Sequence, residues 1–454
     1  MRIVHLGLGA FHRSHQAWYT ARANEAAPGD PWGIAAFTGR SPQAADDLGA
    51  QDGLFTLITR AADGDRAEIV GSISAAVDGA DAVRWRELIA APSTAILTIT
   101  ITERGYCADA DGRLDQRLES VRDDLRLLRS GAAGAVQTAP GRIVDGLRAR
   151  RAAGGAPIAI VSCDNLAGNG ELCRAVVLEL ARAVDADLAG WAASAVSFVS
   201  TMVDRITPAT AAEDVAEAAE LTGYADAVPV VAEPFAEWVL AGEFPAGRPA
   251  WESAGALFVD DVAPYEQRKL WLLNAGHSLL AYLGLLRGHD TIAAAMADPN
   301  CIELLERLWA EAAECLPFGD AEIAATTRTL RARFANPRIR HLLSQIASDG
   351  SAKLPVRVVP VLRERREAGR APGAGQAALV AAWMLHLGGP GHLVQDAGAA
   401  GLRDRLSGEA HADAAATLDF LDPVLGADPA LVSAVADAAF RLSSPSENPE
   451  GKNP

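Results

Sequence analysis

The fold is decided by the stretch Ile3-Val4-His5-Leu6-Gly7-Leu8-Gly9-Ala10-Phe11-His12. A short apolar run ends there in two glycines, and a helical pattern follows from about His12 to Ala26. A second apolar run, Trp32–Phe37, then leads to a turn at Gly39. This order of strand, glycine-rich turn, helix and strand predicts a βαβ unit, and therefore a parallel sheet.

The glycine turn lies where a dinucleotide-binding fingerprint would lie. Gly7 would permit a tight turn, Gly9 would let the backbone approach a pyrophosphate, and the following helix N-terminus would supply amide hydrogens. His12 replaces the third glycine of that fingerprint, so an ordinary glycine turn is the alternative. The strand-turn-helix context favours a cofactor site, with these predicted contacts: Gly7, Gly9, Ala10, Phe11, His12 and Arg13.

The second strand ends without the acidic residue that normally binds the adenosine ribose of NAD. Its place is taken by Thr38-Gly39-Arg40-Ser41-Pro42, in which Arg40 and Ser41 could meet the 2′-phosphate of NADP. We therefore include Arg40 among the predicted cofactor residues. The expected cofactor is NAD or NADP, and the sequence leaves the preference open.

Composition excludes several classes of protein. The 454 residues are 50% hydrophobic, which suffices for a large core and two or three domains. A formal net charge of -17 argues against nucleic acid and anionic lipid as partners. The five cysteines form no CxxC pair, no zinc ligand set is visible, and no signal peptide or membrane span is evident. We expect a cytoplasmic protein without a metal site.

Further apolar runs indicate how the chain is divided. Ala95–Ile101 and Ile158–Val161 are rich in β-branched residues, as buried parallel strands are. Later segments are rich in Ala, Leu, Glu and Arg at helical spacing. We predict an α/β, Rossmann-like doubly wound domain over residues 1–262, a mostly α-helical substrate and catalytic domain over 263–442, and a disordered tail over 443–454.

Two polar clusters follow predicted strands, at the sheet edge where ligands of open α/β proteins bind. Thr102-Glu103-Arg104-Gly105-Tyr106 follows one strand, and Ser162-Cys163-Asp164-Asn165 follows the next. Asn165 could donate a hydrogen bond to a substrate oxygen, and Glu103 could relay a proton. The alternative is that the second cluster merely caps the next helix.

A helix is predicted to begin at Asp261-Val262-Ala263-Pro264, where an acid precedes a proline in the first turn. At about 100° per residue, Lys269, Asn274 and His277 fall within an arc of roughly 140° in a leucine-rich segment. Polar groups are costly there without partners or a ligand. A lysine whose pKa is lowered by desolvation could take the hydroxyl proton of an alcohol, while Asn274 and Asn165 hold the oxygen and His277 orients the lysine. The alternative is a solvated lysine and a hydrogen-bonded core histidine.

Several motifs, in a fixed order over nearly the whole chain, resemble those of the mannitol dehydrogenase family, the long-chain polyol dehydrogenases. They are Gly7–Arg13 with His15-Gln16-Ala17, Thr102–Tyr106, Ser162–Asn165 with Asn169-Gly170, Met202–Ile206, Glu233-Pro234-Phe235, Lys269 with Asn274 and His277, and Asp349-Gly350-Ser351 with Lys353 and Pro355. The resemblance implies an N-terminal nucleotide-binding domain and a helical C-terminal domain, with the substrate between them and no metal.

The resemblance also implies roles for single residues. The lysine that matches Lys269 would be the general acid/base. The asparagines that match Asn165 and Asn274 would polarise the reacting oxygen. The residues that match His277 and Asp204 would contact or orient the substrate.

Two positions depart from the pattern of the mannitol 2-dehydrogenases. Those enzymes tend to have glycine after the glutamate that matches Glu103, which belongs to a proton path, whereas this chain has Arg104. They also tend to have arginine where Gln345 stands. Both features resemble the fructuronate reductases of the family, and a basic residue would suit a carboxylate. We therefore expect Arg104 and Gln345 to bind substrate.

The expected activity is NAD(P)-dependent interconversion of a sugar alcohol or aldonate and its keto form, either D-mannonate and D-fructuronate or D-mannitol and D-fructose. The expected partner is a small sugar alcohol, ketose or sugar acid, and the sequence does not indicate an oligomeric state. Arabinitol and mannitol 1-phosphate are alternative substrates, the latter because five arginines fall within residues 328–340. A non-catalytic nucleotide-binding redox sensor is another alternative. A methyltransferase would leave the lysine helix unexplained.

Overall fold

The computed structural model describes residues 1–39, 41–131, 134–389 and 394–443. Arg40 and nearly all of the predicted disordered tail therefore lie outside the described residues. The chain divides into two compact units, Met1–Tyr265 and Glu266–Pro454. Among the described residues, no helix is both long and apolar enough to cross a membrane.

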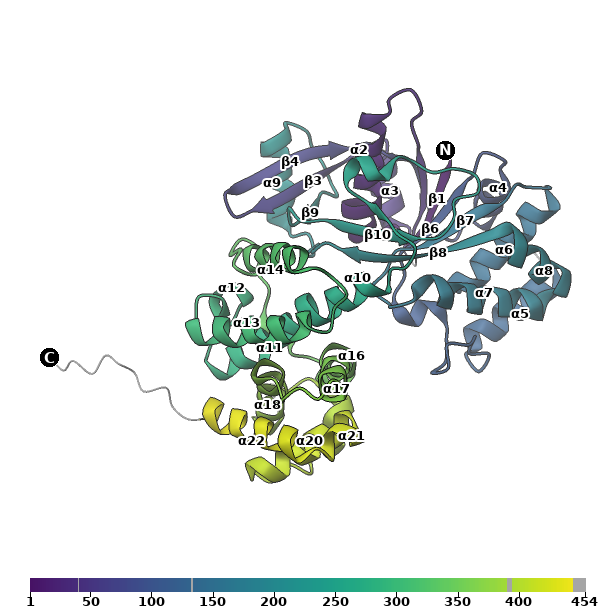
Figure 1. Ribbon diagram of the computed structural model, residues 1–454. Helices are drawn as coiled ribbons and strands as arrows, with labels where there is room; N and C mark the ends of the chain where they lie inside the picture. The colour runs from purple at the N-terminus through teal and green to yellow at the C-terminus, as the bar shows by residue number, and fades with distance from the viewer. Residues whose placement is uncertain (40, 132–133, 390–393, 444–454) are drawn as a thin grey trace. The chain divides into compact units, whose positions relative to one another are not determined.

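The first unit is built on an eight-stranded sheet with the order β11-β10-β8-β7-β6-β1-β2-β5 (Figure 1). Neighbours from β5 to β8 are parallel, β8 and β10 are antiparallel, and β10 and β11 are parallel. The strand order reverses direction at β1, as in a doubly wound sheet. The expected Rossmann-like fold class is confirmed. The strands are β1 (Ile3–Leu6), β2 (Ile34–Phe37), β5 (Ile73–Val77), β6 (Ile96–Ile99), β7 (Ile158–Ser162), β8 (Val196–Asp204), β10 (Glu237–Ala241) and β11 (Leu257–Phe258).

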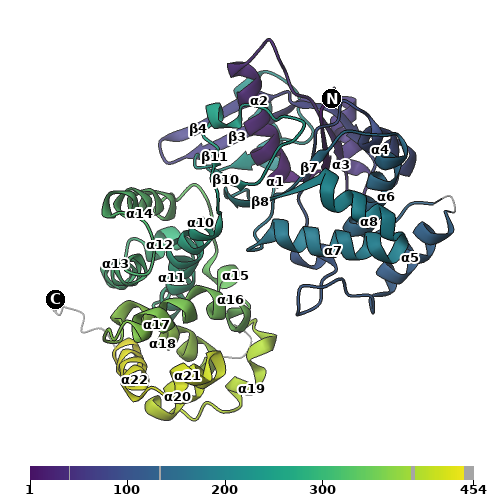
Figure 2. The ribbon, with the colours of Figure 1, turned by 45° about the vertical axis from the view of Figure 1, so that its right-hand side comes forward.

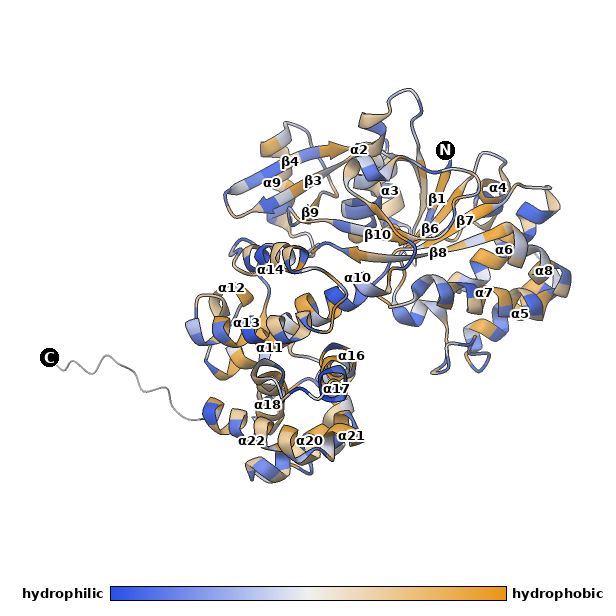
Figure 3. Cartoon of the chain, in the orientation of Figure 1, coloured by the Kyte–Doolittle hydropathy of each residue, from blue (hydrophilic) through white to orange (hydrophobic). Residues whose placement is uncertain are grey.

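Helices cover both faces of this sheet, which explains why its parallel strands are apolar on both sides (Figure 3). Val4 and Leu6 pack on one face, whereas Ile3 packs on the other. The first face is covered by α4 (Ala82–Ala90), α5 (Glu119–Ser130), α6 (Ala139–Ala152), α7 (Asn169–Val184) and α8 (Ala186–Ala195). The second is covered by α1 (Ala10–His12), the π-helix Arg13–Ala17, α2 (Trp18–Ala26) and α3 (Gln43–Ala50).

A second, three-stranded sheet in this unit was not expected from the sequence. Its order is β4-β3-β9, formed by β3 (Phe55–Ala61), β4 (Gly64–Val70) and β9 (Val230–Ala232), with α9 (Ala212–Thr222) packed on it. The antiparallel hairpin of β3 and β4 gains its third strand from a segment far along the chain, and such a pairing leaves no local sequence pattern.

The second unit is mostly helical in its described residues, as expected (Figure 2). Its central helix is α18 (Ala374–Gly388), which is apolar on all sides and packs against α11, α13 and α22. The helices are α10 (Ala263–Arg268), which begins in the first unit, the π-helix Lys269–Asn274, α11 (Ala275–Leu286), α12 (Ile292–Ala295), α13 (Pro299–Ala313), α14 (Asp320–Phe334), α15 (Leu343–Ile346), α16 (Gly350–Arg357), α17 (Val359–Glu367), α18, α19 (Ala400–Arg403), α20 (Ala410–Leu421), α21 (Pro423–Gly426) and α22 (Pro429–Ser443).

Candidate active site

The glycine turn after β1 is tight at one glycine and open at the other. Gly7 has φ +112°, and a Cβ there would lie 2.1 Å from the carbonyl oxygen of Thr100 at the end of β6. Gly9 is extended, at φ -142°, and a Cβ there would meet only the Gly7 oxygen, at 3.7 Å. The protein itself therefore requires glycine at Gly7, whereas the open space beside Gly9 suits a ligand at the start of α1.

A cavity of about 840 Å³ opens at the carboxyl ends of β2, β1 and β6, which is the topological switch point of the sheet. Its described lining contains two arginines and no carboxylate, in a chain whose formal net charge is -17. The N-terminus of α6 also faces it. The lining residues are Leu6, Gly7, Gly39, Ala80, Thr100, Ile101, Thr102, Arg104, Gly105, Cys107, Ser120, Ala135, Val136, Gln137, Thr138, Ala139 and Arg142.

His12, at the place of the third glycine, is a packing residue in this structure. Its ring stacks on that of His5 in β1, with ring centroids 3.3 Å apart, and both rings are fully buried. Burial lowers the pKa of His5 to about 3 and that of His12 well below its usual range, so both rings are neutral. Arg13 also points into the protein, where it donates a hydrogen bond to the carbonyl of Val228. Ala10 and Phe11 are half-buried in the first turn.

Three predicted site residues lie at or just beyond the ends of three adjacent parallel strands, and so at one edge of the sheet. Glu103 follows β6 and is exposed, Asn165 follows β7 and is exposed, and Asp204 is the buried last residue of β8. Arg104 lines the cavity beside the glycine turn. The structure therefore brings Arg104, a predicted substrate residue, next to the predicted cofactor site.

The residues around Asn165 hold the loop that follows β7 through hydrogen bonds. Asn169 is fully buried: its side-chain amide donates to the Thr201 carbonyl at 2.9 Å, and its Oδ1 accepts from the Thr201 amide at 3.0 Å. Asp164 accepts a hydrogen bond from the hydroxyl of Tyr106, and burial raises the pKa of Asp164. These contacts fix the loop that presents Asn165, in line with the alternative that this cluster shapes the start of a helix.

The lysine helix is not the regular α-helix that the sequence pattern predicts. Between α10 and α11, residues Lys269–Asn274 form a π-helix. In an α-helix, residues five apart differ by about 140° around the axis. The i→i+5 bonding of a π-turn brings them nearly above one another. The π-helix thus places Lys269 and Asn274, both half-buried, closer to one face than the predicted α-helix would.

Contacts within the second unit hold this segment. The buried guanidinium of Arg357 in α16 donates to the carbonyl of Asn274 at 3.2 Å and to the hydroxyl of Ser278 at 2.8 Å, and burial lowers the pKa of Arg357 to about 10. The His277 ring stacks on Phe334, with centroids 4.4 Å apart. Gln345 is exposed on α15, in the same unit.

Lys353 and Asp349 belong to the last motif of the resemblance. The Lys353 ammonium donates to the carbonyls of Ile346 at 3.1 Å and Ser348 at 2.6 Å, and burial lowers its pKa. Asp349 has φ +54° where α16 begins, and its amide donates to the Gln395 carbonyl. This turn therefore folds around the lysine.

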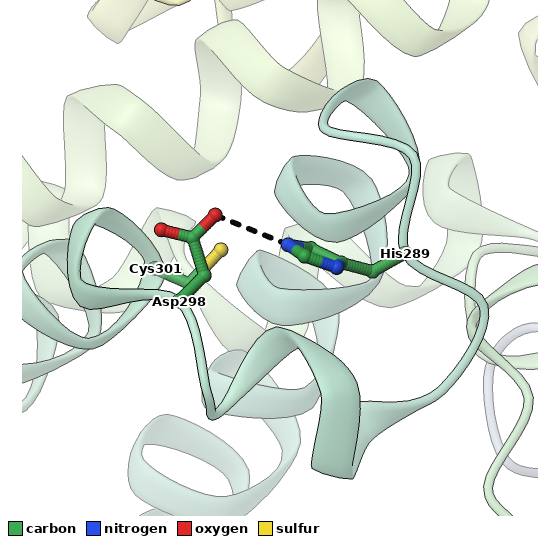
Figure 4. A group of neighbouring side chains, drawn as sticks. All are labelled: His289, Asp298 and Cys301. Atoms are coloured by element: carbon green, nitrogen blue, oxygen red, sulfur yellow. Dashed lines mark hydrogen bonds and ion pairs between the residues drawn. The ribbon is translucent and has the colours of Figure 1, made fainter. Parts of the chain in front are cut away.

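One group of side chains among the described residues has the composition of a metal site: His289, Asp298 and Cys301 (Figure 4). Asp298, however, caps α13 and forms ion pairs with Arg287 and with His289 if that ring is protonated. Burial opposes ionisation, but hydrogen bonds from Arg287 and His289 hold the pKa of Asp298 well below its usual value. Burial raises the pKa of Cys301 to about 12. A neutral thiol beside a carboxylate that already pairs with Arg287 and caps α13 is a poor set of metal ligands.

Sequence reasoning missed part of the cavity lining, in particular Thr138 and Arg142. The hydroxyl of Thr138 caps α6 by accepting a hydrogen bond from the Gly141 amide at 3.0 Å, and Pro140 stands in the first turn. A Thr residue followed by a proline in the first turn is a recognisable helix start, so α6 could have been located from sequence. That its first turn faces the glycine turn could not.

Comparisons with known proteins identify the family of this chain. The family models for the mannitol dehydrogenase Rossmann domain and C-terminal domain match residues 1–253 and 261–438. The chain is 40% identical to D-mannonate oxidoreductase of Escherichia coli K12, over 80% of this chain and 75% of the relative. It is 39% identical to mannitol 2-dehydrogenase of Cereibacter sphaeroides, over 85% of this chain and 80% of the relative.

Among solved structures, the chain is similar to Pseudomonas fluorescens mannitol 2-dehydrogenase in ternary complex with NAD and D-mannitol. The TM-score is 0.78 and the identity 35%, over 97% of this chain and 91% of that chain. Both family models together span most of the sequence. The chain therefore belongs to the mannitol dehydrogenase family and is an oxidoreductase.

Proposed function

We propose that this chain is an NAD(P)-dependent dehydrogenase that interconverts a sugar alcohol or aldonate with its keto form, either D-mannonate and D-fructuronate or D-mannitol and D-fructose. The observation that carries the proposal is the cavity at the switch point, which has no acid in its described lining and is bounded by the glycine turn and the start of α6. The names of the mannonate and mannitol relatives supply the substrate class.

The turn and cavity fit a dinucleotide. Gly9 leaves room beside the backbone amides at the start of α1, where a pyrophosphate would be held, and Ala10 and Phe11 complete that turn. His12 and Arg13 would support the cofactor site without touching the cofactor. The His12 ring packs on His5 of β1, and Arg13 donates to the carbonyl of Val228, so both side chains hold the turn in place. When bound, the nicotinamide supplies or accepts the hydride.

The remaining chemistry is a proton transfer, which falls to the chain's own residues. Lys269 would take the hydroxyl proton during oxidation and return one to the oxygen during reduction. Asn274 and Asn165 would donate hydrogen bonds to that oxygen as charge builds on it. His277 would orient the reacting group, and Glu103 would lie on the path of the proton to solvent. No metal is required for these steps.

Substrate choice would depend on Asp204, Arg104 and Gln345. The guanidinium of Arg104 suits the carboxylate of a sugar acid, and D-mannonate oxidoreductase is among the relatives. A phosphorylated substrate has less support, since Arg331, in the basic stretch that could bind a phosphate, is paired with Glu306. D-Arabinitol remains an alternative, because a D-arabinitol 4-dehydrogenase is 37% identical over 80% of this chain.

Nicotinamide absorbance with purified protein tests the activity. D-Fructuronate and D-fructose are each compared with NADH and NADPH. Oxidation of NADH or NADPH by fructuronate alone supports the sugar-acid assignment. Oxidation of either reduced cofactor by fructose alone supports the polyol assignment. Cofactor binding without turnover of either substrate, or of pentitols and phosphorylated sugars, would favour the redox-sensor alternative.

The lysine mechanism is tested with Lys269→Ala. Loss of a general acid/base should lower kcat at least about 100-fold. Cofactor binding should persist, because the cavity is lined by residues of the first unit only. Gln267→Ala, two residues earlier in the same helix, is the matched control and should keep near-normal turnover. Near-normal turnover of Lys269→Ala would remove the lysine mechanism and leave the cofactor site standing.

A further inference from the structure

At the end of the cavity near β2, the guanidinium of Arg142 contacts both the residues that follow β2 and the segment that precedes α6. Arg142 of α6 donates hydrogen bonds to the carbonyls of Thr38 at 3.3 Å, Gly39 at 3.2 Å and Val136 at 3.4 Å. Thr38 and Gly39 directly follow β2, the strand whose end contacts the adenosine ribose in dinucleotide-binding sheets. Arg142 is therefore tied to the backbone that would receive that ribose.

The positive charge of Arg142 is not paired. All three acceptors are neutral carbonyl oxygens, and within the described residues it forms no ion pair. An arginine carries five N–H groups, so two remain available for a ligand. Burial lowers the pKa of Arg142, while the charges of Asp124 and Asp78 oppose that change.

Those two carboxylates have other partners. Asp124 accepts from the amides of Gln137 and Thr138, both at 2.8 Å, and from the Thr138 hydroxyl at 2.6 Å. Asp78 accepts from the Ala80 amide at 3.0 Å. Neither lines the cavity. The face of the cavity at β2 is thus positive and free of acids in its described lining.

Gly79, two residues after β5, makes room for this arrangement. A Cβ at Gly79 would lie 2.1 Å from the Thr38 oxygen and 2.8 Å from Nη1 of Arg142. The Gly79 amide also donates to the Thr38 hydroxyl at 2.9 Å. The close approach of β5, β2 and α6 therefore depends on the missing side chain at Gly79.

We propose that Arg142 binds the 2′-phosphate of NADP(H), so that this chain binds NADP(H) at least as tightly as NAD(H). The inference rests on the proposed function, because it takes the cavity as the dinucleotide site with the adenosine toward β2. Sheets of this kind that select NAD place an acid at the end of β2, and that acid repels a 2′-phosphate. Here the corresponding described positions lack one, and a guanidinium with free N–H groups lies beside them.

Equilibrium binding, followed by protein fluorescence, separates this inference from activity. The ligands are NAD⁺, NADP⁺ and the fragment pair 5′-AMP and adenosine 2′,5′-bisphosphate. In the wild type, NADP⁺ should bind at least as tightly as NAD⁺, and the bisphosphate more tightly than 5′-AMP. Arg142→Met should weaken NADP⁺ and the bisphosphate at least about tenfold, because a charge-assisted contact is lost, and weaken NAD⁺ less than about threefold. Arg142→Lys should retain part of the preference.

Two further variants guard against a folding artefact. Arg148→Met removes a charge from the same helix, where Arg148 contacts Leu128 and Asp145, and should change neither affinity. Ser41→Asp adds a carboxylate to an exposed position after β2 and should weaken NADP⁺ selectively. NAD⁺ binding more than about twofold tighter than NADP⁺ in the wild type would overturn the inference. So would an equal loss for both cofactors in Arg142→Met. Absence of binding by either dinucleotide would instead overturn the proposed function itself.

Discussion

Alanine at Gly7 should damage both the fold and cofactor binding, whereas alanine at Gly9 should damage binding alone. At Gly7 the side chain meets two obstacles, a backbone at φ +112° and a carbonyl oxygen 2.1 Å from the new Cβ. Backbone strain and overpacking against the end of β6 together amount to about 2–5 kcal/mol. At Gly9 the backbone is extended, and the atom nearest to an added Cβ is 3.7 Å away. The free energy of unfolding of Gly9→Ala should therefore differ from that of the wild type by less than about 0.5 kcal/mol.

Gly223→Ala is the matched control for backbone strain. Gly223 ends α9 in the same unit at φ +76°, with nothing within 4 Å of a new Cβ. It should lose about 1–2 kcal/mol and no cofactor affinity. Urea unfolding gives the stabilities, and fluorescence titration with NAD⁺ and NADP⁺ gives the affinities. The methyl group of Gly9→Ala fills the space assigned to the pyrophosphate, so binding should weaken at least about tenfold. Unchanged affinity in Gly9→Ala would refute that assignment, and equal stability of Gly7→Ala and Gly223→Ala would refute the clash.

Three other predictions concern stability and metals. Burial lowers the pKa of His5 from 6.5 to about 3, so neutral His5 contributes fully to the free energy of unfolding above pH 6.5. That contribution is lost as the pH falls, and at pH 5 the loss is about 2 kcal/mol. The variant His5→Phe should therefore show a smaller decline of Tm between pH 7 and pH 5 than the wild type. Arg150 is fully buried and donates to five backbone carbonyls, so Arg150→Met should lower the free energy of unfolding by about 3–5 kcal/mol in urea, and a change below about 1 kcal/mol would contradict this. Prolonged dialysis against a chelator should leave turnover and Tm unchanged, and a loss of either that zinc restores would show that the protein holds a metal after all.

The sequence predicts four adjacent strands of the large sheet, β2, β1, β6 and β7, because their signals are local. An apolar run that ends in glycine gave β1 and its turn, and β-branched runs gave β6 and β7, with ends within two residues of those observed. The smaller sheet was missed because the β3–β4 hairpin pairs with β9, which lies far along the chain. Arg142 was missed for the same reason: it lies about a hundred residues from Thr38 and Gly39, whose carbonyls it contacts, and only packing brings them together.

The lysine helix shows where periodicity fails. Under α geometry, Lys269 and Asn274 stand at opposite margins of a roughly 140° arc. The apolar pattern on either side of them is helical, so nothing in the composition of the segment marks the change to i→i+5 bonding. His12 is a second example. Its position suggested a cofactor contact, while its stacking on His5 depends on a strand and a helix meeting in three dimensions.

The π-turn also sets a limit on how this helix can vary. Its two ends are anchored independently: Arg268 pairs with Glu322 before the turn, and Leu279 and Leu280 lie in the core after it. Between these anchors the number of residues, more than their identity, fixes how far Lys269 is rotated relative to Asn274. Removal of any one residue between 269 and 274 would restore the α repeat and turn the lysine by about 100°. The backbone geometry of this segment should therefore survive substitutions that keep its length, but not a deletion.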